Sequence, residues 1–301
     1  MSDQPATYRS GFAALIGRSN VGKSTLLNRL IGQKIAITSD KPQTTRNRIL
    51  GILSRPDGQV LFLDTPGLHM ARSRLNKLMV EQAREACREV DLILWLVEAD
   101  RQVDDEPLVA QALAQSGAPV VLVVNKCDLV GPPQLMPLLA AYGQLREFAA
   151  IVPVSAVTGM GCERLVEVIM GELPEGPRYY PDDQVTDLPE RFIAAELIRE
   201  RVLTHTRDEV PYGAAVLIES FQEDPARNLV VIQAVITVER EMHKRIVVGK
   251  GGTMIRRIGQ EARLAIEGLL GVRVFLELFV RVQQGWTGSD RALREFGYLG
   301  E

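Results

Sequence analysis

Residues 17–24 read Gly17-Arg18-Ser19-Asn20-Val21-Gly22-Lys23-Ser24 and match the pattern Gly-x4-Gly-Lys-Ser. This stretch follows a short apolar run, residues 11–16, and precedes a helical stretch, residues 25–30. Glycines let backbone N–H groups turn inward around phosphate groups, and the positive end of a helix adds to the attraction. The sequence therefore predicts a phosphate-binding loop between a buried strand and a helix.

Different residues of this loop are suited to bind different parts of a nucleotide. We expect Lys23 to bridge the outer phosphates and the Ser24 hydroxyl to bind Mg²⁺, with residues 17–25, Thr25 included, forming the phosphate site. The alternative is a glycine turn that only caps a helix. We favour the phosphate site because a buried strand and a helix flank the loop.

The region around this loop alternates between strand-like and helix-like segments. The turn Arg55-Pro56-Asp57-Gly58 separates two apolar runs and predicts a hairpin. Apolar runs joined by helical stretches indicate a mostly parallel sheet with helices on both faces. The expected strands are residues 11–16, 49–54, 59–63, 91–97, 119–124 and 150–154.

A different pattern follows a stretch with three prolines, residues 173–183. There the sequence predicts helices over 190–205 and 253–270 and strands over 213–221, 229–239 and 272–282. We therefore expect two α/β domains, residues 1–175 and 188–301, joined by a linker, residues 176–187.

Composition places the chain among ordinary globular proteins. It has 301 residues, a formal net charge of -3, 46% hydrophobic and 24% charged residues, which excludes disorder and collagen-like architecture. The longest apolar run, residues 92–97, is too short for a membrane helix, and no secretory signal is visible. The three cysteines lack zinc spacing and are typical of a reducing cytosol.

A second candidate motif, Asp64-Thr65-Pro66-Gly67, closes the predicted hairpin. An acid at this position can hold Mg²⁺ through water, and the Gly67 N–H can bond a terminal phosphate. The same tetrapeptide also forms ordinary turns. Its place after a strand, downstream of the phosphate loop, favours the phosphate role.

A third motif, Asn125-Lys126-Cys127-Asp128, follows another predicted strand. A carboxylate at Asp128 can accept hydrogen bonds from guanine N1–H and the 2-amino group, and adenine offers neither donor. We expect Asn125 to tie this loop to the phosphate loop and Lys126 to cover the base. Near Ser155-Ala156, a backbone N–H is expected to meet guanine O6. Ordinary strand-end turns are the alternative for both segments.

Together these motifs resemble those of translation-factor-class GTPases. The resemblance places Gln43-Thr44-Thr45-Arg46-Asn47 at the first switch, a segment ordered by the γ-phosphate and released on hydrolysis. It implies that Thr45, with Thr44 as the alternative, completes Mg²⁺ coordination with Ser24 and Asp64. Lys23, Thr45 and Gly67 are the expected catalytic residues.

The second region carries a Gly-x-x-Gly loop that resembles that of a KH domain, a module that clamps single-stranded RNA. Between Arg240 and Arg263 there are seven Lys or Arg residues and two acids, a positive cluster in a chain of net charge -3. A capping turn beside a solvated basic helix is the alternative. The expected RNA-binding residues are Gly249, Lys250, Gly251, Gly252, Lys244, Arg245, Arg256 and Arg257.

A GTPase domain followed by one KH domain resembles the Era family, within the TrmE-Era-EngA-type GTPases. The resemblance implies a P-loop GTPase fold followed by a smaller α+β type II KH domain. It also implies binding to the 3′ region of 16S rRNA and the 30S subunit, a role in small-subunit maturation, a monomer, and a cytoplasmic and peripheral inner-membrane location. Ser19 stands where the family usually has Pro and Cys127 where Val is common. We expect neither side chain to contact nucleotide.

Hydrolysis itself is expected to be slow. Leu68 follows Gly67, and an apolar side chain cannot orient water as Gln does in Ras-type enzymes. His69 is next, and we expect a surface residue there. Related GTPases with Asn in the phosphate loop bind K⁺ beside the phosphates, which implies a K⁺ site near Asn20; a solvated Asn is the alternative.

Two other functions fit part of the sequence. A P-loop kinase for a small molecule would share residues 17–24 but would have no use for residues 125–128. A GTPase whose second domain binds only proteins would share both domains but not RNA binding. The four ordered motifs and the basic cluster favour a GTP-dependent RNA-binding switch over both.

Overall fold

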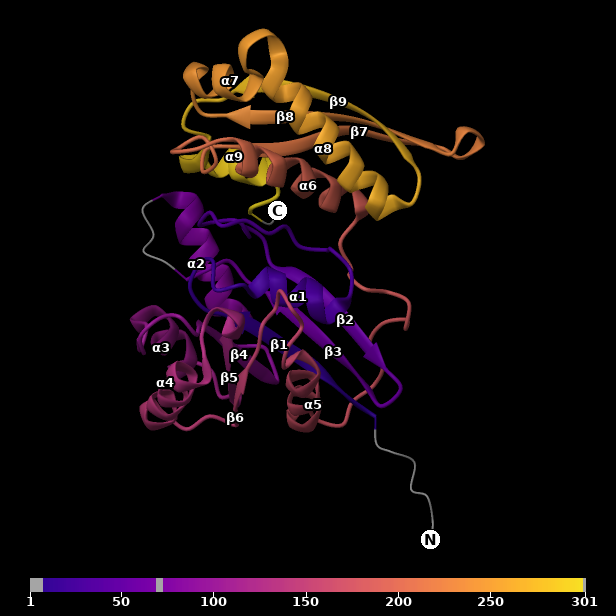
Figure 1. Ribbon diagram of the computed structural model, residues 1–301. Helices are drawn as coiled ribbons and strands as arrows, with labels where there is room; N and C mark the ends of the chain where they lie inside the picture. The colour runs from indigo at the N-terminus through magenta and orange to yellow at the C-terminus, as the bar shows by residue number, and fades with distance from the viewer. Residues whose placement is uncertain (1–7, 69–72, 300–301) are drawn as a thin grey trace. The chain divides into compact units, whose positions relative to one another are not determined.

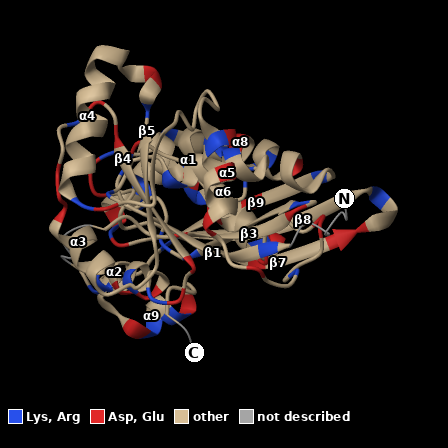
Figure 2. Cartoon of the chain, turned by 90° about the horizontal axis from the view of Figure 1, so that it is seen from below, with Lys and Arg blue, Asp and Glu red and all other residues tan. Residues whose placement is uncertain are grey.

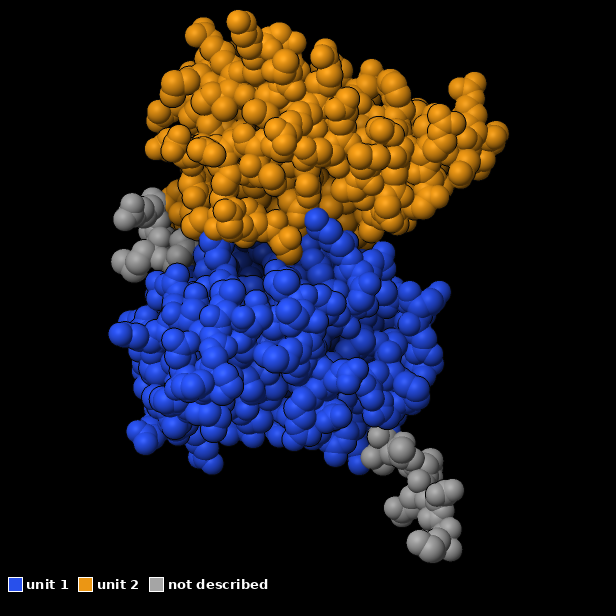
Figure 3. All heavy atoms as spheres, in the orientation of Figure 1, with its two compact units in different colours: residues 1–36, 45–70, 79–187 blue, residues 37–44, 71–78, 188–301 orange. Residues whose placement is uncertain are grey.

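The computed structural model describes residues 8–68 and 73–299 (Figure 1). The chain divides into two compact units, coloured separately in Figure 3. The first comprises residues 1–36, 45–70 and 79–187, and the second comprises residues 37–44, 71–78 and 188–301. The expected division after residue 187 therefore coincides with the start of the main part of the second unit, while the functional limits 1–175 and 188–301 stay a prediction.

A six-stranded sheet forms the centre of the first unit, in the order β2-β3-β1-β4-β5-β6. Only β2 runs antiparallel to its neighbour, which confirms the mostly parallel sheet. Strand β4 is buried along its whole length, as expected for an apolar run covered on both faces. The strands are β1 Arg9–Ile16, β2 Ile49–Arg55, β3 Gly58–Asp64, β4 Leu92–Glu98, β5 Val120–Asn125 and β6 Ala150–Pro153.

Helices pack on this sheet and enclose its core. Trp95 of β4 is fully buried, and its ring lies 6.1 Å from that of Tyr142 and 5.9 Å from that of Phe148. The helices are α1 Lys23–Ile31, α2 Arg74–Ala86, α3 Pro107–Ala114, α4 Pro132–Leu145 and α5 Cys162–Glu172, with a short 3₁₀ turn η1 Cys127–Leu129. Only residues 79–86 of α2 belong to the first unit.

The carboxyl ends of the parallel strands lie at one edge of the sheet, where open α/β folds bind ligands. Ile16, Asp64, Glu98 and Asn125 end β1, β3, β4 and β5. Each is followed by a loop rather than by another strand residue. The fold therefore gathers the predicted motif residues at this edge.

Residues 176–187, expected as a linker, pack on the first unit. The N–H groups of Tyr179 and Tyr180 donate to the Gln59 side-chain oxygen at 2.9 and 3.0 Å. The Thr186 hydroxyl donates to the Leu50 carbonyl oxygen at 2.6 Å. These bonds hold the connection along the edge formed by β2 and β3, and the main part of the second unit begins at Leu188.

The second unit has a three-stranded sheet in the order β7-β8-β9, with β7 antiparallel and β9 parallel to β8. Its elements are α6 Glu190–His205, β7 Ala215–Asp224, η2 Pro225–Arg227, β8 Leu229–Val238, α7 Glu241–Val248, η3 Lys250–Gly252, α8 Thr253–Leu270, β9 Arg273–Val282, η4 Trp286–Gly288 and α9 Asp290–Glu295. Helices α6 and α8 have the expected bounds. Helices α7 and α9 were not expected.

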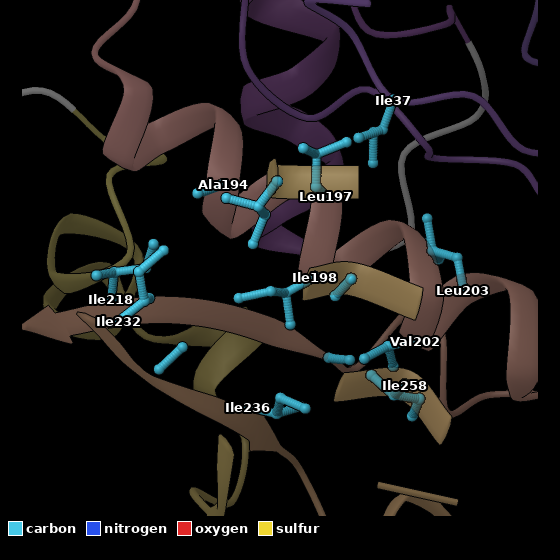
Figure 4. Close-up of a cluster of buried hydrophobic side chains, with 14 of the residues drawn as sticks. Ile37, Ala194, Leu197, Ile198, Val202, Leu203, Ile218, Ile232, Ile236 and Ile258 are labelled. Carbon is cyan, nitrogen blue, oxygen red and sulfur yellow. The ribbon is translucent and has the colours of Figure 1, made fainter. Parts of the chain in front are cut away.

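A hydrophobic core joins the helices of the second unit to one face of its sheet (Figure 4). Ile198 of α6, Ile236 of β8 and Ile258 of α8 are fully buried in it. Ile37, from residues 37–44, is buried in the same cluster. Among the described helices of the chain, none combines the length and the apolar character needed to cross a bilayer.

Candidate nucleotide-binding and RNA-binding sites

The phosphate-type loop between β1 and α1 depends on glycine at two positions. Gly17 and Gly22 have φ of 143° and 98°, a region that favours glycine. A Cβ at Gly17 would lie 2.5 Å from the Leu96 carbonyl oxygen, and one at Gly22 would lie 2.2 Å from the Asn125 amide nitrogen. Helix α1 begins at Lys23 without a side-chain cap, so its first N–H groups face the loop.

The three expected metal ligands meet at the start of α1. Ser24 Oγ donates to Asp64 Oδ2 at 2.6 Å and lies 2.8 Å from Thr45 Oγ1. All three side chains are buried, and Asp64 Oδ1 has no hydrogen-bond partner in the described part of the chain. Hydroxyl and carboxylate oxygens are the donors that Mg²⁺ prefers. The donor set and the unpartnered oxygen therefore fit this ion.

Lys23 and Asp64 form a buried charged pair beside these hydroxyls. Burial lowers the pKa of Lys23, and the Asp64 charge opposes that shift. Burial also raises the pKa of Asp64, opposed first by Lys23 and then by hydrogen bonds from Ser24 and Thr45. The Lys23 ammonium donates to the carbonyl oxygens of Gly17 and Arg18 at 3.2 and 2.8 Å, so it is held over the loop.

The structure places Thr45 and Thr44 differently. Thr45 reaches Ser24 and Asp64, whereas the Thr44 hydroxyl donates to the Lys41 carbonyl oxygen at 2.7 Å. The Thr44 carbonyl oxygen in turn accepts from the buried guanidinium of Arg199. Of the two expected alternatives, Thr45 has the geometry of a metal ligand.

Gly67 lies against the phosphate-type loop. A Cβ at Gly67 would lie 2.7 Å from both the backbone nitrogen and Oγ of Ser19. The next residue, Leu68, donates its N–H to the Gly17 carbonyl oxygen at 3.1 Å. The Asp64-Thr65-Pro66-Gly67 segment therefore packs against the loop, while the bond from the Gly67 N–H to a terminal phosphate stays a prediction. His69 lies outside the described residues.

One amide side chain joins the expected base loop to two neighbouring loops. Asn125 is buried; its Nδ2 donates to the Val21 carbonyl oxygen at 2.8 Å, and its Oδ1 accepts from the Ala156 N–H at 3.0 Å. The expected tie between the base loop and the phosphate loop is present. The Cys127 N–H donates to the Val154 carbonyl oxygen at 3.1 Å, which adds a second link to the loop after β6.

The remaining base-loop residues surround an exposed carboxylate, Asp128, in η1. Lys126 has a φ of 65° and forms an ion pair with Glu98 at the end of β4. The N–H of Ser155 donates to the Met160 carbonyl oxygen at 2.9 Å, and that of Ala156 is bound to Asn125. Both backbone N–H groups of this segment thus have partners within the protein, and the expected contact of one of them with guanine O6 stays a prediction.

Two acids near this edge were missed from the sequence. Glu98 is buried and bonds both Lys126 and Arg101, and Glu106 is 9% exposed. Burial raises the pKa of Glu106 to about 7, opposed mainly by Arg18. Both line a cavity of about 360 Å³ beside the phosphate-type loop. The position of Glu98 at the end of a predicted strand could have marked it as a site residue. Glu106 lies in a loop without a motif, so no sequence signal pointed to it.

The glycine loop of the second unit connects α7 to α8. Gly249, Gly251 and Gly252 have φ of 74°, 61° and 76°, so three of its four residues adopt a conformation that side chains disfavour. A Cβ at Gly249 would lie 2.7 Å from Met254 Cβ and 2.8 Å from the Met254 backbone nitrogen. The loop therefore turns tightly and leaves Lys250 exposed.

Basic residues flank this loop on both helices, Lys244 and Arg245 on α7 and Arg256 and Arg257 on α8. Figure 2 shows Lys and Arg on α8 in blue. Arg245, Arg256 and Arg257 are exposed, and Lys244 is partly buried. A groove of about 410 Å³ runs beside α8, lined by Arg256, Arg263, apolar β9 side chains and backbone at Gly252 and Gly259. A second, of about 390 Å³, lies at α7 and includes Lys244, Arg245 and Lys250. Positive charge beside an open, glycine-rich turn suits a phosphodiester backbone.

Comparison with known families finds a match for each of the two units. Residues 12–126 match the family model described as "50S ribosome-binding GTPase", and residues 209–287 match that of the KH domain. GTPase Era of Geotalea uraniireducens is 58% identical over 292 residues, which cover 97% of this chain and 98% of that protein. The chain belongs to the Era family of GTPases. GTPase Era of Geobacter metallireducens is 56% identical over 299 residues, 99% of this chain and all of that one.

Solved structures of the Era family have the same fold. Era in complex with MgGDPNP and nucleotides 1506–1542 of 16S ribosomal RNA has a TM-score of 0.94 at 40% identity, covering 97% of this chain and all of that one. Aquifex aeolicus Era bound to GDP·AlF₄⁻ has a TM-score of 0.94 at 39% identity, with the same coverage. The expected GTPase fold followed by a KH domain is therefore confirmed, and the chain is a GTPase.

Proposed function

We propose that this Era-family GTPase binds GTP with Mg²⁺ through residues 1–175, hydrolyses it to GDP and phosphate, and binds single-stranded RNA through residues 188–301. The observation that carries the nucleotide half is the meeting of Ser24, Thr45 and Asp64 beside Lys23. Four groups from three separate segments converge there, which an ordinary helix cap does not require.

The phosphate end of the site follows from these groups. Ser24, Thr45 and Asp64 would hold Mg²⁺, which when bound neutralises charge on the phosphates. Lys23 binds the outer phosphates, and the backbone N–H groups at the start of α1 point at them. Gly67 brings its backbone to the terminal phosphate. Leu68 is buried and apolar, so it cannot orient the attacking water, and the intrinsic rate is slow.

The base end selects guanine through Asp128. Its carboxylate accepts from N1–H and the 2-amino group, whereas adenine would leave it unpaired. Asn125 holds this loop at a fixed distance from the phosphate loop because it bonds Val21 and Ala156 at the same time. A site with these two ends fits GTP and GDP, and a small-molecule kinase would not need its base end.

A calorimetric comparison tests the nucleotide assignment. GTP and GDP should bind at least a hundredfold more tightly than ATP, because a site built to pair with donors rejects a base that lacks them. Asp128→Asn should lose most of that affinity, whereas Asp57→Asn, an exposed acid in the hairpin turn, should not. Equal affinity for ATP and GTP would contradict the assignment.

We also propose that K⁺ binds beside the β- and γ-phosphates near Asn20, where it would supply charge that no arginine provides. Asn20 is the fourth residue of the phosphate loop and has a φ of 68°. Turnover should therefore be faster in KCl than in NaCl at equal ionic strength, and Asn20→Ala should remove the difference. Equal rates in the two salts would exclude a K⁺ site.

The RNA half rests on the glycine loop and its basic flanks. An Era protein has been crystallised with nucleotides 1506–1542 of 16S ribosomal RNA. We propose the 3′ region of 16S rRNA, within the 30S subunit, as the partner of Gly249–Gly252 and the surrounding Lys and Arg residues, and assembly of the small subunit as the role. Crosslinking to total RNA with GTP analogue or GDP should recover small-subunit rRNA near its 3′ end.

A monomer in the cytoplasm, with peripheral association at the inner membrane, completes the proposal. The exposed charge and the buried hydrophobic clusters of the two units favour a protein that needs no partner subunit to fold. Sedimentation should give a mass near 33.3 kDa. Fractionation should find the protein mostly with ribosomal particles, and washing membranes with high salt should release the remainder.

A further inference from the structure

Ser19, the third residue of the phosphate loop, has a side-chain hydroxyl in an unfavourable environment. Ser19 Oγ is buried and has no hydrogen-bond partner within the described residues. A buried hydroxyl without a partner is unfavourable, because water no longer satisfies its donor and acceptor positions. Such a group in a native structure calls for a ligand or a function.

The neighbour of this hydroxyl is Gly67. A Cβ built on Gly67 would lie 2.7 Å from Ser19 Oγ, 2.7 Å from its backbone nitrogen and 2.8 Å from its Cα. Only glycine allows so close an approach of the two backbones. Leu68 N–H donates to the Gly17 carbonyl oxygen at 3.1 Å and fixes the two segments together.

If Gly67 contacts the terminal phosphate, its neighbour Ser19 offers a neutral donor to the same group. Gly67 is the residue proposed above to contact that phosphate, and the inference rests on that proposal. A serine hydroxyl donates one hydrogen bond and adjusts by rotation about Cβ–Oγ. A hydrogen bond from it to an anionic oxygen is stronger than one between neutral groups. The buried, apolar Leu68 offers no such group.

Contrary to the expectation from the sequence that this side chain does not contact nucleotide, we propose that the Ser19 hydroxyl donates a hydrogen bond to a γ-phosphate oxygen of GTP at Gly67 and stabilises the charge that develops there during hydrolysis. In that reaction the water oxygen bonds phosphorus while the bond from phosphorus to the β–γ bridging oxygen breaks. GDP leaves with the electron pair, and the proton lost by water ends on phosphate or solvent. Ser19 keeps its own proton throughout.

The inference predicts a selective effect on the triphosphate state. GDP has no γ-phosphate, so Ser19→Ala should change GDP affinity less than twofold. Affinity for GDPNP and single-turnover hydrolysis of GTP should each fall about tenfold or more, as expected for one lost donor to a transition-state oxyanion. Ser19→Gly removes the methylene as well, and should lose as much as Ser19→Ala if the hydroxyl is responsible.

Each measurement can overturn the proposal. Wild-type turnover in either variant, or faster turnover, would mean that the side chain contributes nothing or obstructs the site. A parallel fall in GDP affinity would indicate a structural role in the loop. Failure of wild-type protein to bind GDPNP would instead remove the proposed phosphate site, whereas a loss of GDPNP affinity confined to the Ser19 variants, with wild-type binding intact, would assign the effect to the hydroxyl.

Discussion

The Asn125 side-chain amide donates to the Val21 carbonyl oxygen over 2.8 Å and links the loop after β5 to the loop before α1. Its oxygen accepts from the Ala156 N–H, so one buried side chain spans three loops. A Cβ on Gly22 would lie 2.2 Å from the Asn125 amide nitrogen. The hydrogen bond from Asn125 to Val21 therefore requires glycine at position 22. The same Asn125 side chain positions both the base loop and the phosphate loop.

Asn125→Ala should weaken GDP and GTP binding together. The change leaves the Val21 carbonyl and the Ala156 N–H without their partner, at a residue that is 2% exposed. Leaving buried polar groups unpaired costs about 1–3 kcal/mol, so both affinities should fall about tenfold or more and the free energy of unfolding should fall by a similar amount. Calorimetry and urea unfolding measure these changes.

The matched control is Gln144→Ala, an amide on the exposed side of α4. Both quantities should stay at wild-type values in that variant. Loss of GTP affinity with intact GDP affinity in Asn125→Ala would contradict a support shared by the two ends of the site.

Substitutions of Thr44 and Thr45 in the first switch should differ in their effect on hydrolysis when Mg²⁺ is limiting. Thr45→Ala removes a hydroxyl that lies 2.8 Å from Ser24 Oγ, so hydrolysis should need more Mg²⁺ and proceed at least tenfold more slowly at saturation. Thr44→Ala removes only a bond to the Lys41 carbonyl oxygen and should leave the Mg²⁺ requirement unchanged. Titrating Mg²⁺ in single-turnover assays distinguishes them, and a reversed order would assign the ligand to Thr44.

Glu106 should make the nucleotide-free protein less stable as pH rises. Its pKa is about 7 in the folded chain against 4.5 ordinarily, so the native state holds a proton that the unfolded state has lost between those values. The free energy of unfolding therefore falls as pH rises through this window, by on the order of 3 kcal/mol in total.

Removing the carboxyl tests that sign. Glu106→Gln should equal wild type near pH 4.5 and exceed it in stability at pH 8, measured by urea unfolding. Glu163→Gln, an exposed acid on α5, should follow the wild-type curve at both values. Other charged or ionisable groups face Glu106, and subtracting the Glu106→Gln curve from the wild-type curve isolates the contribution of Glu106 from theirs. These groups are Arg18, Lys23, Glu98, Asp104 and Tyr142. Parallel curves for Glu106→Gln and wild type would contradict the raised pKa.

Local signals predicted much of this fold because they lie within single elements. Helix α8 has the expected bounds, residues 253–270, since Gly252 and Gly271 flank an amphipathic stretch and take φ of 76° and 68°. Helix α7 escaped notice because Ile246, Val247 and Val248 have strand-like side chains. Only contact with the rest of the unit, where Val247 is fully buried, makes that segment helical.

Relations between distant segments were beyond the sequence. Nothing in the pattern of residues 37–44 indicates that Ile37 is buried with α6, or that Thr38 N–H donates to Glu200 at 2.9 Å. The motifs and the family resemblance predicted Ser24, Asp64 and Thr45 as metal ligands, but not that Ser24 Oγ lies 2.6 Å from Asp64 Oδ2 and 2.8 Å from Thr45 Oγ1. A contact between segments as distant as those of Thr38 and Glu200 leaves no periodic trace in either partner.

RNA binding should depend on the glycine loop of the second unit. Replacing Lys250 and Gly251 with Asp reverses one exposed charge and adds another in a loop that must approach a phosphodiester backbone. Affinity for single-stranded RNA with the 3′ sequence of 16S rRNA should fall by at least a hundredfold at moderate salt, because each lost phosphate contact also reduces counterion release. GDP affinity should not change, since residues 249–252 belong to the second unit and the nucleotide site to the first.

The control must carry the same change in charge away from the loop. Arg164→Asp with Gly171→Asp does so on α5, where Arg164 is exposed and a Cβ on Gly171 meets no atom within 4 Å. If RNA affinity falls equally in both double variants, net charge alone governs binding and the glycine loop has no special part. If it falls in neither, the second unit binds RNA elsewhere or serves as a protein-interaction module. A loss confined to the Lys250 and Gly251 variant, with a shallower dependence of affinity on salt, is the expected result, because direct contacts to the backbone set that slope.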